Sequence, residues 1–520
     1  MVITIADRGN TEKPCRAGLN VLGAASALMV ALTTNTNAAE WKIQPTAAIQ
    51  ETYSSNIKLA AQGAEKSDFV SEITPGISII GTGRDLQVNL NYAMQNLVYA
   101  NNSSADTIRN QLSANAHAVL VDDLFFWDAR GAITQQNISP LGPQASDNIN
   151  DTGNRANVET YTLSPYLRHR FGEAAVTELH YTHDGVRTNT ALLNSNIDTA
   201  LFKLDSGRSF KTLGWGFQYN DQKTNYGDST PPVEMQTTSA NLSYRLTPRF
   251  SWTETFGYEK NSYTWSGGNP AGRFWMSGFS WAPTDRTSIS ASGGKRFYGT
   301  TYALSSSVRS RTTLWSLDYA EDITTTQGQF TALNTLDQYY SLLYPSDTPA
   351  QRQQQMNLDY NALPGFSVNP NALFANNYFT NRIFLQKRLQ GTALLKSGKS
   401  SFLLGGYYTV RTSQTAATSD IALFGTSSFT DKIKEAGANA QWNWKVFSRT
   451  TANFTTDYIR ASAPTLGGKS DTKRVTIGLT KQFQPKLDGS IGYRHVLQKS
   501  SQVVGKITED AVFASLLMRF

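Results

Sequence analysis

The segment AVFASLLMRF, residues 511–520, has the alternation of an extended strand. Counting back from Phe520, every second residue is apolar: Met518, Leu516, Ala514 and Val512. The residues between them are mixed, so the strand has one apolar face. Because an unpaired edge strand invites association with other chains, we expect this strand to close against another part of the same protein.

The same alternation recurs along the chain. In LQVNLNYAMQ, residues 86–95, apolar and polar residues alternate without interruption. Similar patterns occur in residues 112–118, 161–167, 242–246, 315–319, 438–444 and 475–479. Alternating segments of about ten residues separated by turns are typical of a transmembrane antiparallel β-barrel. A soluble all-β sandwich or propeller is the alternative, and two features argue against it.

The first feature is the length of the connections, because short turns and long loops alternate along the chain. Long polar connections, such as residues 137–157, separate most of the tight ones, as in outer-membrane barrels. The tight turns are expected at residues 81–85, 121–123, 171–173, 206–209, 247–249, 283–286, 396–400, 445–449 and 484–486.

The second feature is the position of the tryptophans. Those beside the tight turns are Trp127, Trp252, Trp281, Trp442 and Trp444. Indole rings favour the headgroup level of a membrane, so these residues predict an aromatic girdle at one interface. A second girdle is expected at the opposite strand ends, from Tyr263, Trp265, Phe297 and Tyr298.

The number of strands is predicted as about 20 to 22. The pattern itself indicates about 21, but both termini should lie on the tight-turn side, which requires an even number. Residues 324–378 are the ambiguous region, where a strand such as GQFTALNT, residues 328–335, could rise into a long loop.

The same region, residues 324–378, also has helical features. Leu333, Leu336, Tyr340 and Leu343 have helical spacing, and Thr348 followed by Pro349 is typical of a helix start. Short helices here could form a plug or gate in the lumen, or an ordered loop without a gating role. Both interpretations remain open at this stage.

The N-terminus has the pattern of a signal peptide. An apolar stretch, residues 17–32, follows three basic residues and precedes small residues at a cleavage position after Ala38. A membrane anchor is the alternative, but the apolar stretch is short. Cleavage would remove Cys15, the only cysteine, and leave residues 39–520 as a single barrel domain.

The composition excludes several function classes. Charged residues make up 17% of the chain, below the roughly 25% of average soluble proteins. The net charge of +7 is spread without a basic stripe, so nucleic acid is not expected as a partner. His180 and His183 would lie on opposite faces of a strand, which makes a poor metal site. No spacing singles out a nucleophile with its base, so neither an enzyme nor a cofactor is expected, although barrel enzymes are a rival class.

The functional candidates are therefore residues predicted to line the lumen. They lie opposite the apolar faces: Arg168, Arg170, Glu178, His180, Asp184, Arg245, Glu435, Asn439, Gln441 and Arg494. Mixed charge with many amide and hydroxyl groups would suit a polar solute such as a glycan. For each residue alone, the need to solvate the interior is the favoured explanation.

Closure of the sheet would satisfy every backbone group in lipid. The last strand is expected to pair with the first, around residues 41–53. The alternate apolar residues Leu516, Met518 and Phe520 resemble the C-terminal signal that the insertion machinery reads in bacterial outer-membrane barrels. The expected location is the outer membrane of a Gram-negative cell, with membrane lipid and the insertion machinery as partners.

Several segments resemble a family of outer-membrane proteins associated with the PEP-CTERM/exosortase system, which are found near exopolysaccharide loci. The similarity lies in residues 43–59, 67–95, 257–263, 275–302 and 309–327. The resemblance implies a role in exporting, assembling or anchoring extracellular polysaccharide, with polysaccharide or export proteins as partners, and it transfers no functional residues.

The combined expectation is a monomeric outer-membrane barrel that serves as a conduit or structural component in exopolysaccharide export. A general diffusion porin and a surface-adhesion or matrix-anchoring barrel are the alternatives.

Overall fold

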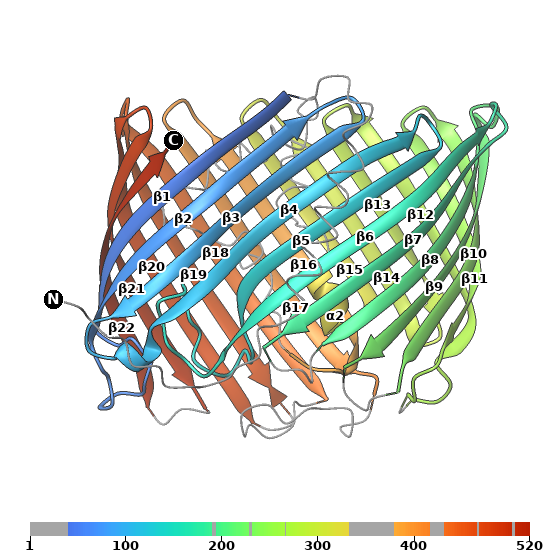
Figure 1. Cartoon of the computed structure of the whole chain (residues 1–520). Helices are drawn as coiled ribbons and strands as arrows, with labels where there is room; N and C mark the ends of the chain where they lie inside the picture. Colours follow the sequence, from blue (N-terminus) through green and yellow to red (C-terminus); the bar gives the residue numbers. More distant parts are fainter. Residues whose placement is uncertain are drawn as a thin grey trace.

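The computed structural model describes residues 40–189, 194–227, 231–265, 267–331, 379–415, 431–464, 467–501 and 505–520. The predicted signal peptide and most of the predicted plug region, residues 332–378, lie outside these ranges. The described residues form one closed sheet of 22 strands (Figure 1). The expected all-β barrel is therefore confirmed, with an even number of strands.

Each strand pairs antiparallel with its neighbours in sequence. The strands are β1 (Glu40–Ser54), β2 (Asp68–Thr82), β3 (Leu86–Tyr99), β4 (Thr107–Val121), β5 (Phe125–Asn137), β6 (Arg155–Phe171), β7 (Ala175–Thr188), β8 (Ser195–Ser206), β9 (Leu213–Tyr226), β10 (Val233–Thr247), β11 (Phe250–Asn261), β12 (Ala271–Thr284), β13 (Thr287–Arg296), β14 (Gly299–Arg309), β15 (Thr313–Thr325), β16 (Ile383–Lys396), β17 (Ser400–Ser413), β18 (Lys432–Phe447), β19 (Thr450–Ala463), β20 (Gly468–Gln484), β21 (Leu487–Ser500) and β22 (Lys506–Arg519). Within the described ranges, two short helices accompany them: η2 (Ser103–Ala105) and α2 (Thr326–Thr331).

The final strand closes the barrel on the first, as expected. β22 pairs with β1 from Thr46 opposite Arg519 to Ser54 opposite Ala511. The backbone N–H of Phe520 donates to the carbonyl of Pro45 at 3.0 Å, which extends the pairing to the last residue. The sheet therefore has no free edge at this seam.

The two faces of the sheet differ in polarity, as the β1–β22 pair illustrates. Ile49 and Leu516 lie opposite each other and are 53% and 50% exposed, because they point outward. Their neighbours Gln50 and Ser515 are also paired, but they point inward and are only 3% and 5% exposed. The apolar residues thus cover the outside and the polar residues line the inside.

The long connections all lie at one end of the barrel, which also has a few short connections, such as residues 297–298 between β13 and β14. The other short turns lie at the opposite end, where the chain finishes, at the top of Figure 1. All nine predicted tight turns lie on this side. The turn between β14 and β15, residues 310–312, also lies at this end and is not among the predicted turns.

Tryptophans mark the outer surface near the tight turns. Trp252, Trp281, Trp442 and Trp444 are 41%, 43%, 36% and 41% exposed, and Trp127 is half-buried within β5. The rings of Trp442 and Trp444 stack at 5.8 Å between centroids. An apolar exterior with such a girdle is that of a transmembrane β-barrel of the outer-membrane type. No helix within the described ranges is long and apolar enough to cross a membrane.

The prediction of the second girdle is wrong in its residues. Tyr263 is 6% exposed and lies in a buried cluster, against which Trp265 and Phe297 pack. Burial raises the pKa of the Tyr263 hydroxyl. Other tyrosines of the strands are exposed on the outer surface: Tyr53, Tyr181, Tyr258, Tyr302, Tyr408 and Tyr493.

Candidate functional site

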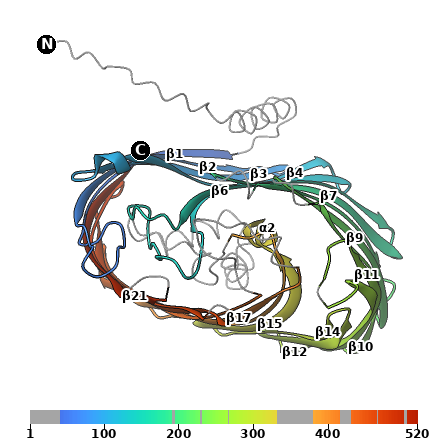
Figure 2. The same cartoon turned by 90° about the horizontal axis from the view of Figure 1, so that it is seen from below.

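The loop between β5 and β6, residues 138–154, folds into the barrel. In Figure 2 it is the teal segment inside the ring, near β21. On the side of β3, the Tyr99 hydroxyl donates to the carbonyl of Ile149 at 2.8 Å. The N–H of Asp151 donates to the carbonyl of Ile57 at 3.0 Å. The loop is thus held at the β1–β3 side of the mouth.

The same part of this loop is also fixed to β21 and β22, which continue the sheet beyond β1, by buried charges. Arg494 forms ion pairs with Asp147 of the loop and with Glu509, the latter at 3.1 Å from Nη2 to Oε1. The side chains of Arg494 and Glu509 are 5% and 0% exposed. Asn150 Nδ2 and Ser54 Oγ also donate to Glu509 Oε1, at 2.8 and 2.7 Å. A buried carboxylate is therefore surrounded by donors from three parts of the chain.

Amide hydrogen bonds complete this attachment. The N–H of Gln144 donates to Gln498 Oε1 at 3.0 Å, and Gln498 Nε2 donates to the carbonyl of Gly142 at 2.7 Å. The Ser500 hydroxyl donates to the carbonyl of Leu141. We call the contacts of residues 141–150 with Arg494, Gln498, Ser500 and Glu509 the loop anchor.

A second segment enters the lumen from β15 and β16. The short helix α2 follows β15 and reaches β6 and β7 (Figure 2). The part of the predicted strand GQFTALNT that is described, residues 328–331, belongs to this helix, so the strand prediction is wrong there. Gln327 of α2 is connected to the segment before β16, because its Nε2 donates to Asn381 Oδ1 at 3.1 Å. In that segment Arg382 forms an ion pair with Asp431 at 2.7 Å.

The two inward segments contact each other. The N–H of Phe379 donates to the carbonyl of Ile138 at 3.1 Å. The Phe379 ring is 1% exposed and packs with Ile138, Ala156, Val158 and Val186. We call this chain of contacts, from β16 through Phe379 and Ile138 to the loop anchor, the inner bridge. It connects the β15–β16 wall with the β21–β22 wall through the lumen.

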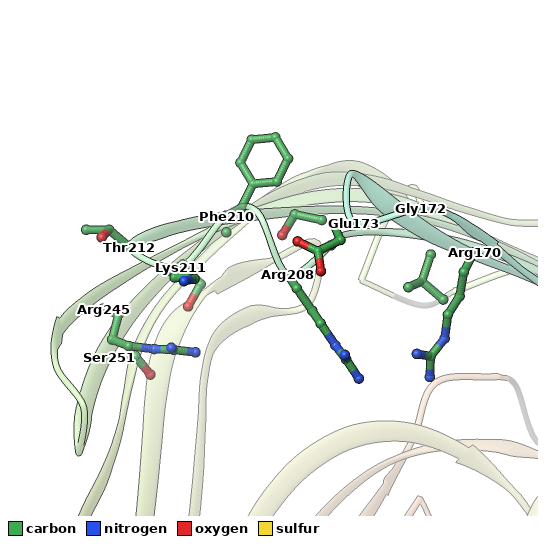
Figure 3. Close-up of a pocket in the computed structure, with 14 residues that line it drawn as sticks. Arg170, Gly172, Glu173, Arg208, Phe210, Lys211, Thr212, Arg245 and Ser251 are labelled. Atoms are coloured by element: carbon green, nitrogen blue, oxygen red, sulfur yellow. The ribbon is translucent and has the colours of Figure 1, made fainter.

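A cavity of about 570 Å³ opens inside the wall at the tight-turn end (Figure 3). It is formed where the turns after β6, β8 and β10 meet. Its polar lining includes Arg170, Arg208, Lys211 and Arg245, with Glu173 as an acidic neighbour. Arg170 and Arg245 had been proposed from sequence, whereas Arg208 and Lys211 lie in a turn, where no periodicity indicates a face.

Four rings form a stack on the inward face of the wall. His117, Phe126, Tyr166 and His180 come from the neighbouring strands β4 to β7. The ring centroids of Phe126 and Tyr166 are 4.9 Å apart, and those of Tyr166 and His180 are 4.5 Å apart, with nearly parallel planes. The faces of the inner rings are occupied by each other, so they offer no flat platform to a ligand.

The other predicted lining residues are distributed around the wall. Glu178 lies 3.3 Å from both Arg168 and His180. Asp184 accepts a hydrogen bond from Thr162 at 2.5 Å, on the opposite strand.

Further around the wall, Glu435, Asn439 and Gln441 are buried on β18, and Glu435 accepts a hydrogen bond from Tyr407. His183 lies apart from His180, beside Asp198. Among the described residues no group of side chains forms a metal site.

Comparisons with known proteins do not assign the chain to a family. No family model and no curated protein matches the chain. Among solved structures, the FrpB iron transporter from Neisseria meningitidis is 11% identical with a TM-score of 0.48, covering 95% of this chain and 83% of that chain. The siderophore receptor PirA from Acinetobacter baumannii is 8% identical with a TM-score of 0.46, covering 93% and 81%. Similarity at this level carries no argument about substrate.

Proposed function

We propose that this outer-membrane barrel is a gated conduit for a polymer, and that the polymer is an exopolysaccharide. The observation that carries the gating is the inner bridge, which joins two walls of a wide barrel through its own loops. Barrels of this size enclose a lumen that outer-membrane transporters of similar strand number keep plugged. Here residues 138–154 and the described ends of the insertion occupy that place.

The bridge is attached in a way that permits release. Its contacts are side-chain hydrogen bonds and ion pairs at the loop anchor and one small apolar cluster around Phe379. When these hydrogen bonds and ion pairs break, water that enters the lumen can solvate the separated polar groups. Opening therefore does not require unfolding of the sheet. A general diffusion porin would need no such attachment. An adhesion barrel would need no cavity at the tight-turn mouth.

The exopolysaccharide assignment rests on the resemblance to the PEP-CTERM-associated family. The polar lining is compatible with a glycan, but it identifies no sugar. Export from the periplasm would bring the polymer first to the tight-turn end, because short turns of outer-membrane barrels face the periplasm.

The proposal is tested by conductance of purified protein in planar bilayers. Three forms are compared: the wild type, a variant with residues 141–150 replaced by a glycine-serine linker, and a variant that lacks residues 332–378. We expect small or rare conductance steps in the wild type and large steps, blocked by soluble dextran, in one or both variants. If all three forms are folded and inserted but none conducts, the conduit proposal fails and the adhesion alternative gains support.

A further inference from the structure

Neighbouring hairpins bring four cations to one cavity at the tight-turn mouth. Arg170 is the last residue but one of β6, and Arg245 is close to the end of β10. Arg208 and Lys211 lie in the turn between β8 and β9. Figure 3 shows the side chains of Arg170 and Arg208 extending in the same direction, away from the ribbon, whereas the Phe210 ring points to the other side. The cavity of about 570 Å³ falls in the range of small-molecule sites.

Arg170 and Arg245 face the lumen and not the lipid. The neighbours of Arg245 along β10, Tyr244 and Leu246, are 48% and 56% exposed on the outer surface, so Arg245 points inward. In the same way Arg170 alternates with Phe171, which is 54% exposed. Headgroups of the surrounding bilayer therefore do not reach the cavity.

Their charges are also uncompensated. Across the described ranges, none of the four forms an ion pair within 4.0 Å, although the cavity includes one carboxylate, that of Glu173. Two other lumenal arginines are paired: Arg168 with Glu178 and Arg494 with Glu509. Four cations against one acid leave an excess of positive charge in the lining of the cavity.

The rim around the cavity reinforces this charge. The charged residues in the turns from β8 to β21 are almost all basic: Arg208, Lys211, Arg249, Asp285, Arg286, Arg311, Lys399, Arg449 and Lys486. The turns from β2 to β7 are mainly acidic instead, with Arg84, Asp85, Asp122, Asp123 and Glu173. A positively charged part of the mouth raises the local concentration of anionic ligands there and speeds their capture.

We propose that Arg170, Arg208 and Arg245 form a binding site for the carboxylate groups of an acidic polysaccharide at the periplasmic entrance. This inference rests on the proposed function, because it specifies the class of polymer that the conduit accepts. Guanidinium groups bind carboxylates through two parallel hydrogen bonds. Several guanidinium groups in one cavity can bind the carboxylates of consecutive acidic sugars. A neutral polysaccharide has no carboxylates and would not form these contacts.

The test is calorimetric titration of the whole detergent-solubilised protein with an oligogalacturonate and with a neutral maltooligosaccharide of equal length. The test variant is Arg170→Gln, Arg208→Gln and Arg245→Gln combined. The matched control, Arg311→Gln, Lys399→Gln and Arg449→Gln, removes the same charge from other turns of the rim. We expect the acidic oligomer to bind the wild type and the control alike, at least tenfold weaker binding to the test variant, and no heat from the neutral oligomer.

Three results would overturn the site: no binding of the acidic oligomer to the wild type, equal loss in the control, or displacement by orthophosphate at the same concentration of charge. The last result would show a site for small anions. Because binding is measured without conduction, it separates the two proposals. If the barrel conducts after loop replacement but does not bind the acidic oligomer, the conduit proposal stands and the proposed binding site is excluded. If it binds the acidic oligomer but does not conduct, the binding site stands and the conduit proposal is excluded.

Discussion

The backbone N–H of Phe379 lies 3.1 Å from the carbonyl oxygen of Ile138, and this contact joins two segments that start from different walls of the barrel. Phe379 precedes β16, and Ile138 follows β5. Neither residue belongs to a strand, so the barrel would close without them. The contact therefore stabilises the segments inside the lumen and not the sheet. A substitution at this contact should separate the two segments of the inner bridge.

We expect Phe379→Ala to loosen the inner bridge. Phe379 is 1% exposed, and truncation of a buried phenylalanine costs about 3–5 kcal/mol in a packed core. Here that cost falls on a small cluster, so the insertion should detach while the sheet persists. Planar-bilayer recordings should show more frequent conductance steps, and a protease added to the long-loop side should cleave faster.

The control for this variant is Phe447→Ala, because Phe447 is 70% exposed on the outer surface. It should leave conductance and cleavage unchanged. Equal conductance of Phe379→Ala and the wild type, with faster cleavage, would mean that the insertion moves without opening a passage.

Arg494→Gln should release the other end of the bridge. Removing one partner of a buried ion pair costs about 3–5 kcal/mol, because the remaining charges stay buried without compensation. Glu509 is fully buried and Asp147 belongs to the loop, so we expect the loop to swing out and hydrate both carboxylates. The measurement is bilayer conductance together with cleavage within residues 141–150.

Arg460→Gln is the matched control for Arg494→Gln, because its ion pair with Asp471, at 3.6 Å, is exposed and such pairs contribute about 0–1 kcal/mol. A second variant, Arg494→Gln with Glu509→Gln, should recover part of the loop attachment, since it removes the buried negative charge. If this double variant conducts as much as the single one, repulsion at Glu509 is not the cause of opening.

The sequence predicted the sheet well because alternation is local information. The alternation within each strand shows which residues lie on each of its two faces. The pairing of β1 with β22 was predicted because the backbone groups of the last strand need hydrogen-bond partners. The residues inside the lumen are different. Asp147 and Phe379 lie in connections without any period, and their partners are distant along the chain. No local pattern could have paired Asp147 with Arg494.

The wrong second girdle has a physical reason as well. Tyr263, Trp265 and Phe297 occur near strand ends, and the prediction placed every such aromatic ring in the headgroup region. The loops after β11 and β13 instead turn these rings toward each other and toward Ile383 at the start of β16. Position along a strand is readable from sequence, but the direction in which a loop folds is not.

Phe256→Arg and Thr255→Arg test the membrane assignment at adjacent positions of β11. Phe256 is 57% exposed on the outer face, whereas Thr255 points into the lumen. An arginine on the lipid face near the middle of a barrel strand costs roughly 2–4 kcal/mol, and one in the lumen is tolerated. Urea unfolding in lipid vesicles should therefore show a lower midpoint for Phe256→Arg alone. Phe256→Ala accounts for the lost ring, and equal midpoints for both arginine variants would contradict the orientation.

Phe520→Ala should impair assembly in cells more than stability. Phe520 is 55% exposed, and its backbone N–H already bonds to Pro45, so loss of the ring removes little from the folded barrel. If the C-terminal residues are the signal for the insertion machinery, the variant should show less folded, heat-modifiable protein in the outer-membrane fraction. It should refold normally into pure lipid vesicles, where no machinery is present. Phe483→Ala, at another exposed ring near a tight turn, should assemble like the wild type. Equal defects of Phe520→Ala in cells and in vesicles would assign the ring a structural role at the β1–β22 seam.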